Sequence, residues 1–406
     1  MKRVLHVIAQ YPGKTGSGVY LKSIMQQCSA KGYDQALIAG VSKEDSLEFK
    51  YADEFYPVVF NSPSIPFPIL GMSDNMPYKS MKYSSISEEM MKKWEIKFKE
   101  VTKNAIGEFK PDVIISHHLW LSTSFIADLA DGIKTIGICH GTDLRQLSKS
   151  PIYKDRVISG CQKLDKVFAL NVEQKKKISD IYIIPKDNIV VVGGGYNEKL
   201  FYFPEKKKYS DNNREIKIIY AGKLSFSKGL MSLLKVFDSI KTKYNTKLYL
   251  AGTGSGEEER SIKEYGREIG NKVIFLGNLK QSQLGDRFRA SDLFVLPSFY
   301  EGLPLVVIES LASGLRIVTT DIPGLKSYLG ETISNSDSIE YVGLPQMLDI
   351  DQPLESDLPI FEDELQLKIE KQILKVLDAK CLDSNIEKEI ELLSWKGVFS
   401  RMEKHL

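Results

Sequence analysis

The chain alternates short, apolar, β-rich runs with longer segments of helical periodicity, and this pattern constrains its fold more than any other feature. Such alternation is typical of βαβ units, whose strands pair in parallel and whose helices cover the sheet. The expected fold class is therefore α/β. Strands are expected at residues 3–9, 35–39, 113–116, 135–139, 167–170, 189–192, 216–221, 247–251, 273–276, 293–296 and 317–319.

The alternation is interrupted once, after the glycines at 193–195. The polar, charged stretch 202–214 that follows is typical of an exposed linker. Two α/β domains joined by one linker are the simplest account. We expect an N-terminal domain over residues 1–199 and a C-terminal domain over residues 200–387.

Two segments fit this scheme poorly. The proline-containing segment 60–83 is long for a loop in a compact domain, and such loops are usually functional or disordered. The acidic, proline-interrupted segment 349–364 is expected to be a solvated excursion on the surface.

Composition and charge disfavour several classes of protein. The net charge is +2, from 55 Lys+Arg against 53 Asp+Glu, which gives no electrostatic reason to expect nucleic acid as the partner. The four cysteines are scattered without a CxxC pair, which disfavours a disulfide framework or a cysteine-bound zinc. The opening apolar run is too short for a signal peptide, and no run approaches the roughly 20 apolar residues that span a bilayer. We therefore expect a soluble, cytoplasmic protein.

The most informative motif is the segment 298–314, which follows the apolar strand at 293–296. Pro304 suits the first position of a helix, so Gly302 lies at a strand-to-helix junction, where free backbone N–H groups bind anions. Glu301 before the helix and Glu309 inside it are then placed to bind different hydroxyls of one polyol-bearing anion. A capped core helix with two surface glutamates is an equally weighted alternative.

A second motif at residues 222–229 also follows a strand and carries two lysines, Lys223 and Lys228. Cations are unfavourable at the N-terminus of a helix, so a bound phosphate would explain their presence. Two solvated lysines in a turn are the more common outcome. The glycine-rich turns at 252–256 and 13–18 are weaker signals, and the second lacks the GxGxxG spacing and the acidic residue of a nicotinamide dinucleotide site.

A histidine at a predicted strand end, His140, is expected to face a cleft, although a structural histidine is more common. His117 and His118 end another strand. They are adjacent and no further ligands complete a set, so we do not expect a metal there.

Taken together, these motifs resemble the retaining, nucleotide-sugar-dependent glycosyltransferases of family 4, which have the GT-B fold of two Rossmann-like domains facing each other across a cleft. Glu301 and Glu309 match the glutamate–x7–glutamate motif of that family. Residues 222–229 match its Gly-Arg-Leu-x-x-x-Lys-Gly motif, with Lys223 in place of arginine. Further similar elements are the glycine-rich loop 16–18, His140, the stretch 194–201 and a C-terminal helix at about 388–406, which would cross back to the N-terminal domain.

The resemblance implies a role for each matching residue. Glu309 would hold the ribose hydroxyls, and Glu301 with the amides after it would hold the donor sugar and the diphosphate. Lys223 and Lys228 would neutralise the charge on the departing diphosphate, and His140 would reach the donor sugar. The implied catalytic residues are His140, Glu301, Lys228 and Lys223. The implied donor-binding residues are Glu309, Gly302, Leu303, Pro304, Leu305, Gly16, Ser17, Gly18, Gly252, Gly254, Asn278 and Leu279, with no metal site and no cofactor, because the nucleotide sugar is a substrate.

The implied activity is metal-independent, retaining transfer of a hexose or N-acetylhexosamine from a nucleotide sugar, most commonly a UDP-sugar, in bacterial envelope, exopolysaccharide or glycoconjugate synthesis. Two departures leave the donor sugar open. Lys223 lacks the bidentate geometry of arginine, and Lys326 stands where the family often has a glutamate. A nucleotide-sugar epimerase of the same fold and a non-catalytic nucleotide-sugar-binding subunit are the alternatives.

The acceptor, a sugar, a lipid-linked sugar or a protein, would bind the N-terminal domain, with residues 60–83 shaping its site. The basic, amphipathic segment 87–109 is predicted to be a helix. It would either lie peripherally on the inner face of a membrane or pack its apolar side into the core. The oligomeric state is left open.

Overall fold

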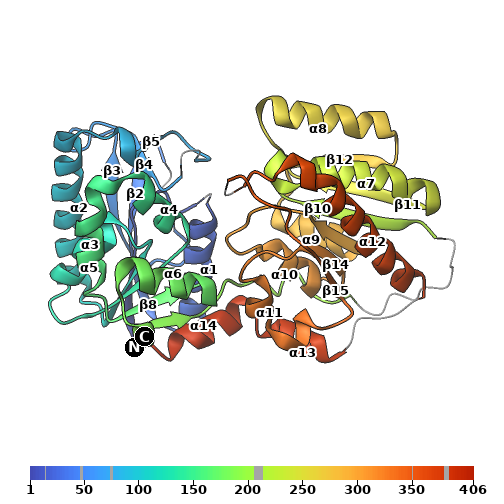
Figure 1. The fold of residues 1–406 in the computed structure, drawn as a ribbon. Coiled ribbons are helices and arrows are strands. Elements are labelled where there is room, and N and C mark those ends of the chain that lie inside the picture. The colour runs from blue at the N-terminus through green and yellow to red at the C-terminus, as the bar shows by residue number, and fades with distance from the viewer. Residues whose placement is uncertain (14, 46–48, 74–75, 205–213, 350, 379–383) are drawn as a thin grey trace. The chain divides into compact units, whose positions relative to one another are not determined.

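The computed structural model describes the whole chain except residues 14, 46–48, 74–75, 205–213, 350 and 379–383. Most of the predicted linker, 202–214, therefore lies outside the described residues. The chain divides into two compact units, residues 1–194 with 398–406 and residues 195–397. Each unit has its own parallel sheet covered by helices (Figure 1).

The sheet of the N-terminal unit is parallel throughout, in the order β3-β2-β1-β6-β7-β8-β9. Its strands are β1 (Arg3–Ile8), β2 (Asp34–Ser42), β3 (Glu54–Phe60), β6 (Val113–His117), β7 (Lys134–Ile138), β8 (Lys166–Ala169) and β9 (Ile189–Val191). Its helices are α1 (Gly16–Ala30), α2 (Glu88–Phe109), α3 (Leu121–Leu129), α4 (Thr142–Lys149), α5 (Lys154–Cys161) and α6 (Val172–Tyr182), with most of α14 (Trp395–Glu403).

The end of the chain packs on this N-terminal unit, as expected from the resemblance. The guanidinium of Arg401 donates two hydrogen bonds, of 3.0 and 2.9 Å, to the carbonyl of Val192. The carboxylate of Glu403 pairs with Lys31 at 3.0 Å and accepts a hydrogen bond from the hydroxyl of Tyr33. Residues 398–406 are therefore an integral part of the N-terminal unit.

Helix α2 forms as predicted and turns its apolar side inward. Trp94 and Phe98 are fully buried and contact the ring of Phe125 on α3. The helix begins at Ser87, whose hydroxyl accepts the N–H of Met90, and ends at Lys110 in the left-handed conformation. This is the arrangement of a surface helix that contributes to the core, the second of the two readings of segment 87–109. None of the helices in the described ranges is long and apolar enough to cross a membrane.

The segment 60–83 is more ordered than a loop, apart from residues 74–75, which are not described. It contains the short parallel pair β4 (Ile69–Gly71) and β5 (Ser80–Lys82). Ile65, Phe67 and Leu70 are buried in the core of the N-terminal unit. The apolar side chains between the prolines explain why this segment packs rather than extending into solvent.

The sheet of the C-terminal unit is also parallel, in the order β12-β11-β10-β13-β14-β15. Its strands are β10 (Ile216–Ala221), β11 (Thr246–Ala251), β12 (Val273–Gly277), β13 (Leu293–Leu296), β14 (Arg316–Thr320) and β15 (Ile339–Val342). Its helices are α7 (Leu230–Lys243), α8 (Gly256–Ile269), α9 (Gln281–Arg289), α10 (Leu305–Ala312), α11 (Leu325–Ser334), α12 (Leu358–Leu377) and α13 (Ser384–Glu391).

The prediction for segment 349–364 was wrong in its second half. Helix α12 begins at Leu358, and Phe361 in its first turn is 3% exposed and packs its ring, tilted by 55°, against that of Phe299. Pro359 lies in the first turn of α12, where proline is tolerated, and the acidic residues of this segment continue into the helix as Glu362, Asp363 and Glu364. The buried side of α12 then packs against α7 and the sheet.

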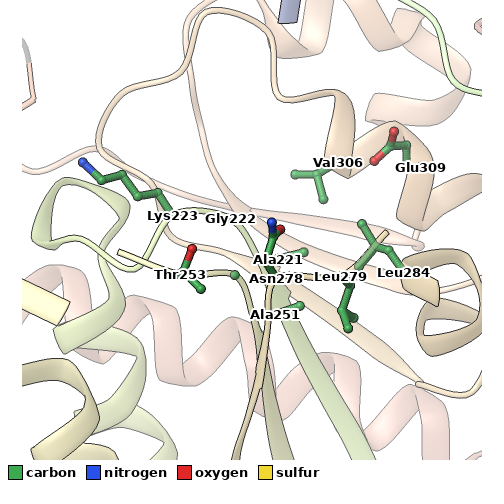
Figure 2. A pocket seen from close by; sticks show the side chains of 11 residues that line it. Ala221, Gly222, Lys223, Ala251, Thr253, Asn278, Leu279, Leu284, Val306 and Glu309 are labelled. Atoms are coloured by element: carbon green, nitrogen blue, oxygen red, sulfur yellow. The ribbon is translucent and has the colours of Figure 1, made fainter. Parts of the chain in front are cut away.

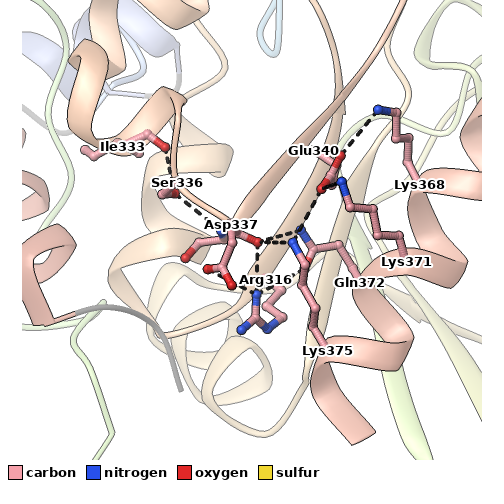
Figure 3. A network of polar contacts seen from close by, with 10 residues as sticks. Arg316, Ile333, Ser336, Asp337, Glu340, Lys368, Lys371, Gln372 and Lys375 are labelled. Atoms are coloured by element: carbon pink, nitrogen blue, oxygen red, sulfur yellow. Dashed lines mark hydrogen bonds and ion pairs between the residues drawn. The ribbon is translucent and has the colours of Figure 1, made fainter. Parts of the chain in front are cut away.

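A polar network fastens α12 to the sheet edge (Figure 3). Glu340 of β15 pairs with three lysines of the helix, Lys371 at 2.6 Å, Lys368 at 3.3 Å and Lys375 at 3.4 Å. Arg316, at the start of β14, is 3% exposed and donates a hydrogen bond to the carbonyl of Asp337. Burial favours the neutral carboxyl of Glu340, but the hydrogen bonds and charges of Lys371 and Lys368 hold its pKa below the usual range.

Of the described strands that the sequence did not predict, β3 and β15 lie at the edges of the two large sheets. β3 contains Pro57 and begins with a glutamate, and β15 is four residues long with Glu340 inside it. An edge strand tolerates proline and charge because one side of its backbone has no neighbour to pair with. The interior strands, which are nearly continuous apolar runs, lie where they were predicted to within a few residues.

Candidate functional site

The turns that follow three neighbouring strands of the C-terminal unit meet at one pocket of about 350 Å³. Lys223 follows β10, Thr253 follows β11 and Asn278 follows β12. In an open parallel sheet, this carboxyl edge is where ligands bind. The full lining is Ala221, Gly222, Lys223, Ala251, Gly252, Thr253, Asn278, Leu279, Leu284, Val306 and Glu309 (Figure 2).

Glycine is required where two of these turns touch. Gly252 has φ +136°, and a Cβ built on it would lie 1.8 Å from the carbonyl oxygen of Gly222. The N–H of Gly222 donates to Ala251, and that of Gly252 donates to Gly277. The turns are therefore pressed together by backbone contacts, and any side chain at Gly252 would separate them.

The two ends of the pocket differ in charge. Glu309 of α10 lies at one end, above the apolar side chains of Leu279, Leu284 and Val306, and Lys223 extends at the other end (Figure 2). Glu309 is 9% exposed, and burial raises the pKa of its carboxyl to about 7. A ligand that donates hydroxyl hydrogens to Glu309 would favour its ionised form, and an anionic group on that ligand would meet Lys223.

Glu301 and Lys228 do not line this pocket but pair with each other. The Nζ atom of Lys228 lies 2.7 Å from Oε1 of Glu301 and donates a hydrogen bond to the carbonyl of Tyr300. The hydroxyl of Ser298 donates to the same carboxylate oxygen at 2.9 Å. The predicted anion-binding lysine and the predicted sugar-binding glutamate thus come together, each about one-fifth exposed.

The turn that carries Lys228 packs directly on the end of β13. Gly229 has φ +66°, and a Cβ on it would lie 2.0 Å from the carbonyl oxygen of Pro297. The N–H of Phe299 donates to the carbonyl of Ser227 at 3.0 Å. The two motifs at 222–229 and 298–314 are therefore neighbours in space although about 75 residues separate them in the sequence.

Helix α10 begins one residue later than predicted. Pro304 is its N-cap residue rather than its first helical residue, and Gly314, with φ +81°, follows its C-cap residue. The amide of Leu305, which the resemblance assigns to the donor, donates to the carbonyl of Leu303 at 2.9 Å. A donor contact to this amide requires that hydrogen bond to be shared or broken. Gly302, Leu303, Pro304 and Leu305 do not line the pocket, and neither does Gly254, whose Cβ would meet the carbonyl of Leu224.

The glycine-rich residues of the N-terminal unit form the first turn of a helix. Gly16, Ser17 and Gly18 begin α1, and the hydroxyl of Thr15 accepts the N–H of Gly18 at 3.1 Å. A Cβ on Gly18 would lie 2.5 Å from the carbonyl oxygen of Pro12. The helix therefore starts tightly against the end of β1, in the strand–turn–helix geometry that exposes amides to an anion.

His140 follows β7 and is half-buried beside two buried histidines, His117, which ends β6, and His118, which follows that strand. Nδ1 of His117 lies 3.0 Å from Nε2 of His140, and the ring of His118 lies 4.7 Å from that of His140. Burial lowers the pKa of each of these histidines. Among the residues that the structure describes, no group of three His, Cys, Asp or Glu side chains is arranged to hold a metal ion.

Some of the predicted site residues are therefore brought together and others are not. The C-terminal pocket collects Gly222, Lys223, Gly252, Asn278, Leu279 and Glu309. Sequence reasoning missed Thr253, Leu284 and Val306 in this pocket, and it missed the contact of His117 with His140. Val306 and Leu284 are ordinary helical apolar residues and give no local signal. His117 did give one, because it ends a predicted strand next to the strand that His140 follows.

Comparisons with known proteins identify a glycosyltransferase domain in each half of the chain. Residues 14–200 match the family model described as Glycosyltransferase Family 4, and residues 201–335 match the model described as Glycosyl transferases group 1. An uncharacterized glycosyltransferase of Haemophilus influenzae is 29% identical over 339 residues, covering 80% of this chain and 83% of the relative. The match spans 49% and 62% of the length of two uncharacterized glycosyltransferases of Methanocaldococcus jannaschii.

Solved structures share the whole fold at low sequence identity. Sucrose-phosphate synthase from Thermosynechococcus elongatus superposes with a TM-score of 0.68 at 16% identity, covering 100% of this chain and 98% of that one. The Anabaena protein HepE, solved in complex with UDP and glucose, has a TM-score of 0.66 at 13% identity and covers 100% of this chain and 99% of that one. These likenesses establish a common fold of two Rossmann-like domains.

Proposed function

Because this chain belongs to the glycosyltransferases of family 4, with the group 1 glycosyl transferase domain in its C-terminal half, we propose that it transfers a hexosyl or N-acetylhexosaminyl group from a UDP-sugar to an acceptor hydroxyl with retention at the anomeric carbon. The observation that carries the proposal is the C-terminal pocket. It joins a buried carboxylate, an apolar wall and Lys223, and the same connection between β10 and α7 carries a second lysine, Lys228.

Each part of the pocket fits one part of a nucleotide sugar. The apolar wall of Leu279, Leu284 and Val306 suits the flat face of a base. Glu309 next to that wall suits the vicinal hydroxyls of a ribose, which donate to a carboxylate. Lys223, at the opposite end, suits the diphosphate.

The transfer reaction requires a second group of residues, which is the pair formed by Lys228 and Glu301. Breaking the bond between the sugar and the diphosphate builds negative charge on the leaving phosphate, and Lys228 with Lys223 stabilises that charge in the transition state. Glu301 binds hydroxyls of the donor sugar once Lys228 turns to the phosphate. Neither lysine requires a metal ion to do this, and we propose that the reaction proceeds without one.

The acceptor is proposed to bind the N-terminal unit, near His140 and the start of α1, with segment 60–83 shaping its site. A sugar hydroxyl in bacterial envelope or glycoconjugate synthesis is the proposed acceptor. Retention follows if the acceptor attacks from the face that the diphosphate leaves, with the leaving phosphate oxygen taking the acceptor proton. The HepE structure, which holds UDP and glucose, supports UDP as the nucleotide.

The test is thermal stabilisation by a panel of UDP-, GDP- and ADP-sugars, each with and without EDTA. A ligand that binds the folded state raises the apparent stability by mass action. We expect one UDP-sugar to raise the Tm, EDTA to leave that shift unchanged, and Glu309→Ala to remove it. Glu331→Ala, at an exposed position of α11, is the matched control. No shift with any nucleotide sugar would contradict the proposal, and loss of the shift in EDTA would contradict its metal-free part.

A further inference from the structure

The N-terminal unit holds an imidazole pair, His117 and His140, of which the proposed reaction uses only His140. Nδ1 of His117 and Nε2 of His140 lie 3.0 Å apart, and the two ring planes differ by only 9°. Tyr20 of α1 contacts both rings edge-on, at 5.2 Å from His140 and 6.3 Å from His117. The hydroxyl of Tyr20 donates to the carbonyl of Gly193 at 2.9 Å, which holds this ring in place.

The sheet topology creates the pair. β6 and β7 are neighbouring parallel strands, and His117 is paired with Ile138. His140 comes two residues after Ile138, so it lies just past His117 at the same edge of the sheet. Asp143 then ties the two strand ends together, because its Oδ2 atom accepts the N–H of Leu119 at 2.9 Å and the N–H of His140 at 3.2 Å. The distance between the two rings is therefore set by backbone that is fixed on both sides.

The hydrogen bond fixes where the protons are. Each neutral imidazole carries one N–H, so two arrangements are available. In the first, Nδ1–H of His117 donates to His140, whose own proton is then on Nδ1. In the second, Nε2–H of His140 donates to His117, whose own proton is then on Nε2.

The burial of His117 distinguishes the two arrangements. Its Nε2 atom is buried and has no hydrogen-bond partner. The second arrangement would bury an N–H group without an acceptor at this atom, which is rare in folded proteins, whereas the first leaves only an unused lone pair there. His140 is the half-buried member of the pair, so in the first arrangement its N–H is on the more open ring.

Neither ring is a cation in this arrangement. Burial lowers the pKa of both well below the usual range, and the neighbouring His118 and His6 add to the effect. The other titratable groups around the pair are Tyr20, Asp143 and Cys139. The carboxylate of Asp143 is committed to the N–H groups of Leu119 and His140 and to the thiol of Cys139, so it does not take a ring proton.

We propose that His117 is a positioning residue, which donates a hydrogen bond from Nδ1 to Nε2 of His140 and so holds the Nδ1–H group of His140 as a fixed donor to an oxygen of a bound sugar. The substrate in this statement rests on the proposed function, but the tautomer does not. The consequence is specific to His140, since an Nε2-protonated ring would have a lone pair on Nδ1 instead of an N–H.

The tautomer can be read directly by NMR, because the chain has only five histidines. Two-bond 1H–15N spectra of the protein labelled with 15N-histidine report which ring nitrogen carries the proton. We expect Nδ1–H for both His117 and His140, and a change of the His140 tautomer in His117→Phe. His117→Asn, whose amide N–H can occupy the place of Nδ1, should restore the wild-type His140 pattern. An Nε2–H tautomer of His140 in the wild type, or an unchanged tautomer in His117→Phe, would overturn the proposal.

Kinetics with the stabilising UDP-sugar provide the second arm. Loss of one positioned hydrogen bond should lower kcat/KM by about tenfold in His117→Phe, with most of it recovered in His117→Asn. His6→Phe is the matched control, since His6 is also a fully buried histidine with one side-chain hydrogen bond, to Gln35. It should lower the Tm without changing kcat/KM or the His140 tautomer. Absence of any donor-induced Tm shift in the wild type contradicts the proposed function, whereas the NMR result decides the positioning role separately.

Discussion

At the scale of single residues, the candidate site depends on charged groups in unfavourable surroundings. Glu309 is buried beside apolar side chains, and Lys228 is held against Glu301 rather than free in solvent. Both arrangements cost stability or freedom in the absence of a ligand. Such groups are typical of functional sites, where binding of the substrate offsets the cost of holding the charged groups in place.

Glu309→Gln should make the free protein more stable at alkaline pH. The folded-state pKa of about 7 lies above the ordinary 4.5, so the folded state holds the Glu309 proton more tightly, and stability falls as pH rises through this window. The glutamine variant lacks this loss. We expect the variant and the wild type to have the same Tm at pH 5. At pH 8 the variant should have the higher Tm, with an unfolding free energy larger by up to about 3 kcal/mol.

The same variant should lose the thermal shift with a UDP-sugar, because an amide replaces the carboxylate that accepts the ribose hydrogens. Differential scanning calorimetry at pH 5 and pH 8, with and without the UDP-sugar, measures both the stability of the free protein and the Tm shift caused by the ligand. Glu331→Gln is the exposed control and should show neither. A Glu309→Gln variant that is no more stable than the wild type at pH 8 would contradict the buried, unpaired state of this carboxyl.

Lys228→Ala should reduce kcat by about 100- to 1,000-fold, the usual effect of removing one group that stabilises charge in a transition state. The KM for the donor should change less, because Lys223 and Glu309 remain. Steady-state kinetics with the stabilising UDP-sugar measures both constants. Lys235→Ala, at an exposed lysine of α7 that pairs with Glu362, is the control. Full turnover in Lys228→Ala would rule out the proposed role of this lysine.

At the scale of secondary-structure elements, the attachment of α12 shows how a helix is fixed by charge as well as by apolar packing. Three lysines on successive turns share Glu340, while Gln372 and Lys375 donate to the carbonyl of Asp337 (Figure 3). This network lies at the beginning of β14 and β15, at the edge of the sheet opposite the pocket. Its function is therefore structural.

Glu340→Gln should destabilise the C-terminal unit by about 1–3 kcal/mol at pH 7, because three lysines then lie together without a carboxylate. The pKa of Glu340 is lowered in the folded state, so its stabilisation is complete above the ordinary carboxyl pKa and is lost as pH falls below it. Urea unfolding should thus show a large difference in unfolding free energy between the wild type and Glu340→Gln at pH 7, and a small one at pH 4. Glu370→Gln, which removes a more exposed pair with Lys243, should change stability less. An equal effect of the two variants would contradict this account.

At the scale of the whole molecule, the two units should respond to acid in opposite directions. All five histidines belong to the N-terminal unit, at positions 6, 117, 118, 140 and 405. Burial lowers the pKa of His6 and His118 to about 4 and that of His117 and His140 well below normal. Since the unfolded chain takes up these protons first, the stability of this unit is full above pH 6.5 and falls as pH decreases below it.

We expect calorimetry to resolve the N-terminal unit as the earlier transition at pH 5. Each buried histidine lowers its stability by up to about 1.4 kcal/mol per pH unit below pH 6.5. The C-terminal unit has no histidine and gains from protonation of Glu309 over the same range. Two of the three tryptophans, Trp94 and Trp120, are in the N-terminal unit and Trp395 is in the C-terminal unit, so most of the tryptophan fluorescence change should follow the N-terminal transition. A main fluorescence transition that does not move to lower temperature, relative to the calorimetric transition of the C-terminal unit, between pH 7 and pH 5 would contradict this expectation.

The sequence by itself determined the parallel sheets, their interior strands and the family. Interior strands such as β1 and β10 are buried on both faces, so they are continuous apolar runs. Such runs can be predicted from the local sequence. The motifs at 222–229 and 298–314 are also recognised from consecutive residues, although only the structure shows that Gly229 approaches the carbonyl of Pro297. These features need no knowledge of distant neighbours.

Only the tertiary structure decided the edge strands, the start of α12 and the partners within the site. β3 contains a proline and β15 a glutamate, and they pair because a neighbouring strand offers them one free edge. Val306 and Leu284 line the pocket because three separate turns converge there, and His117 meets His140 because β6 and β7 are adjacent. Contacts between residues far apart in sequence depend on strand order, and strand order is a property of the folded sheet that no local pattern encodes.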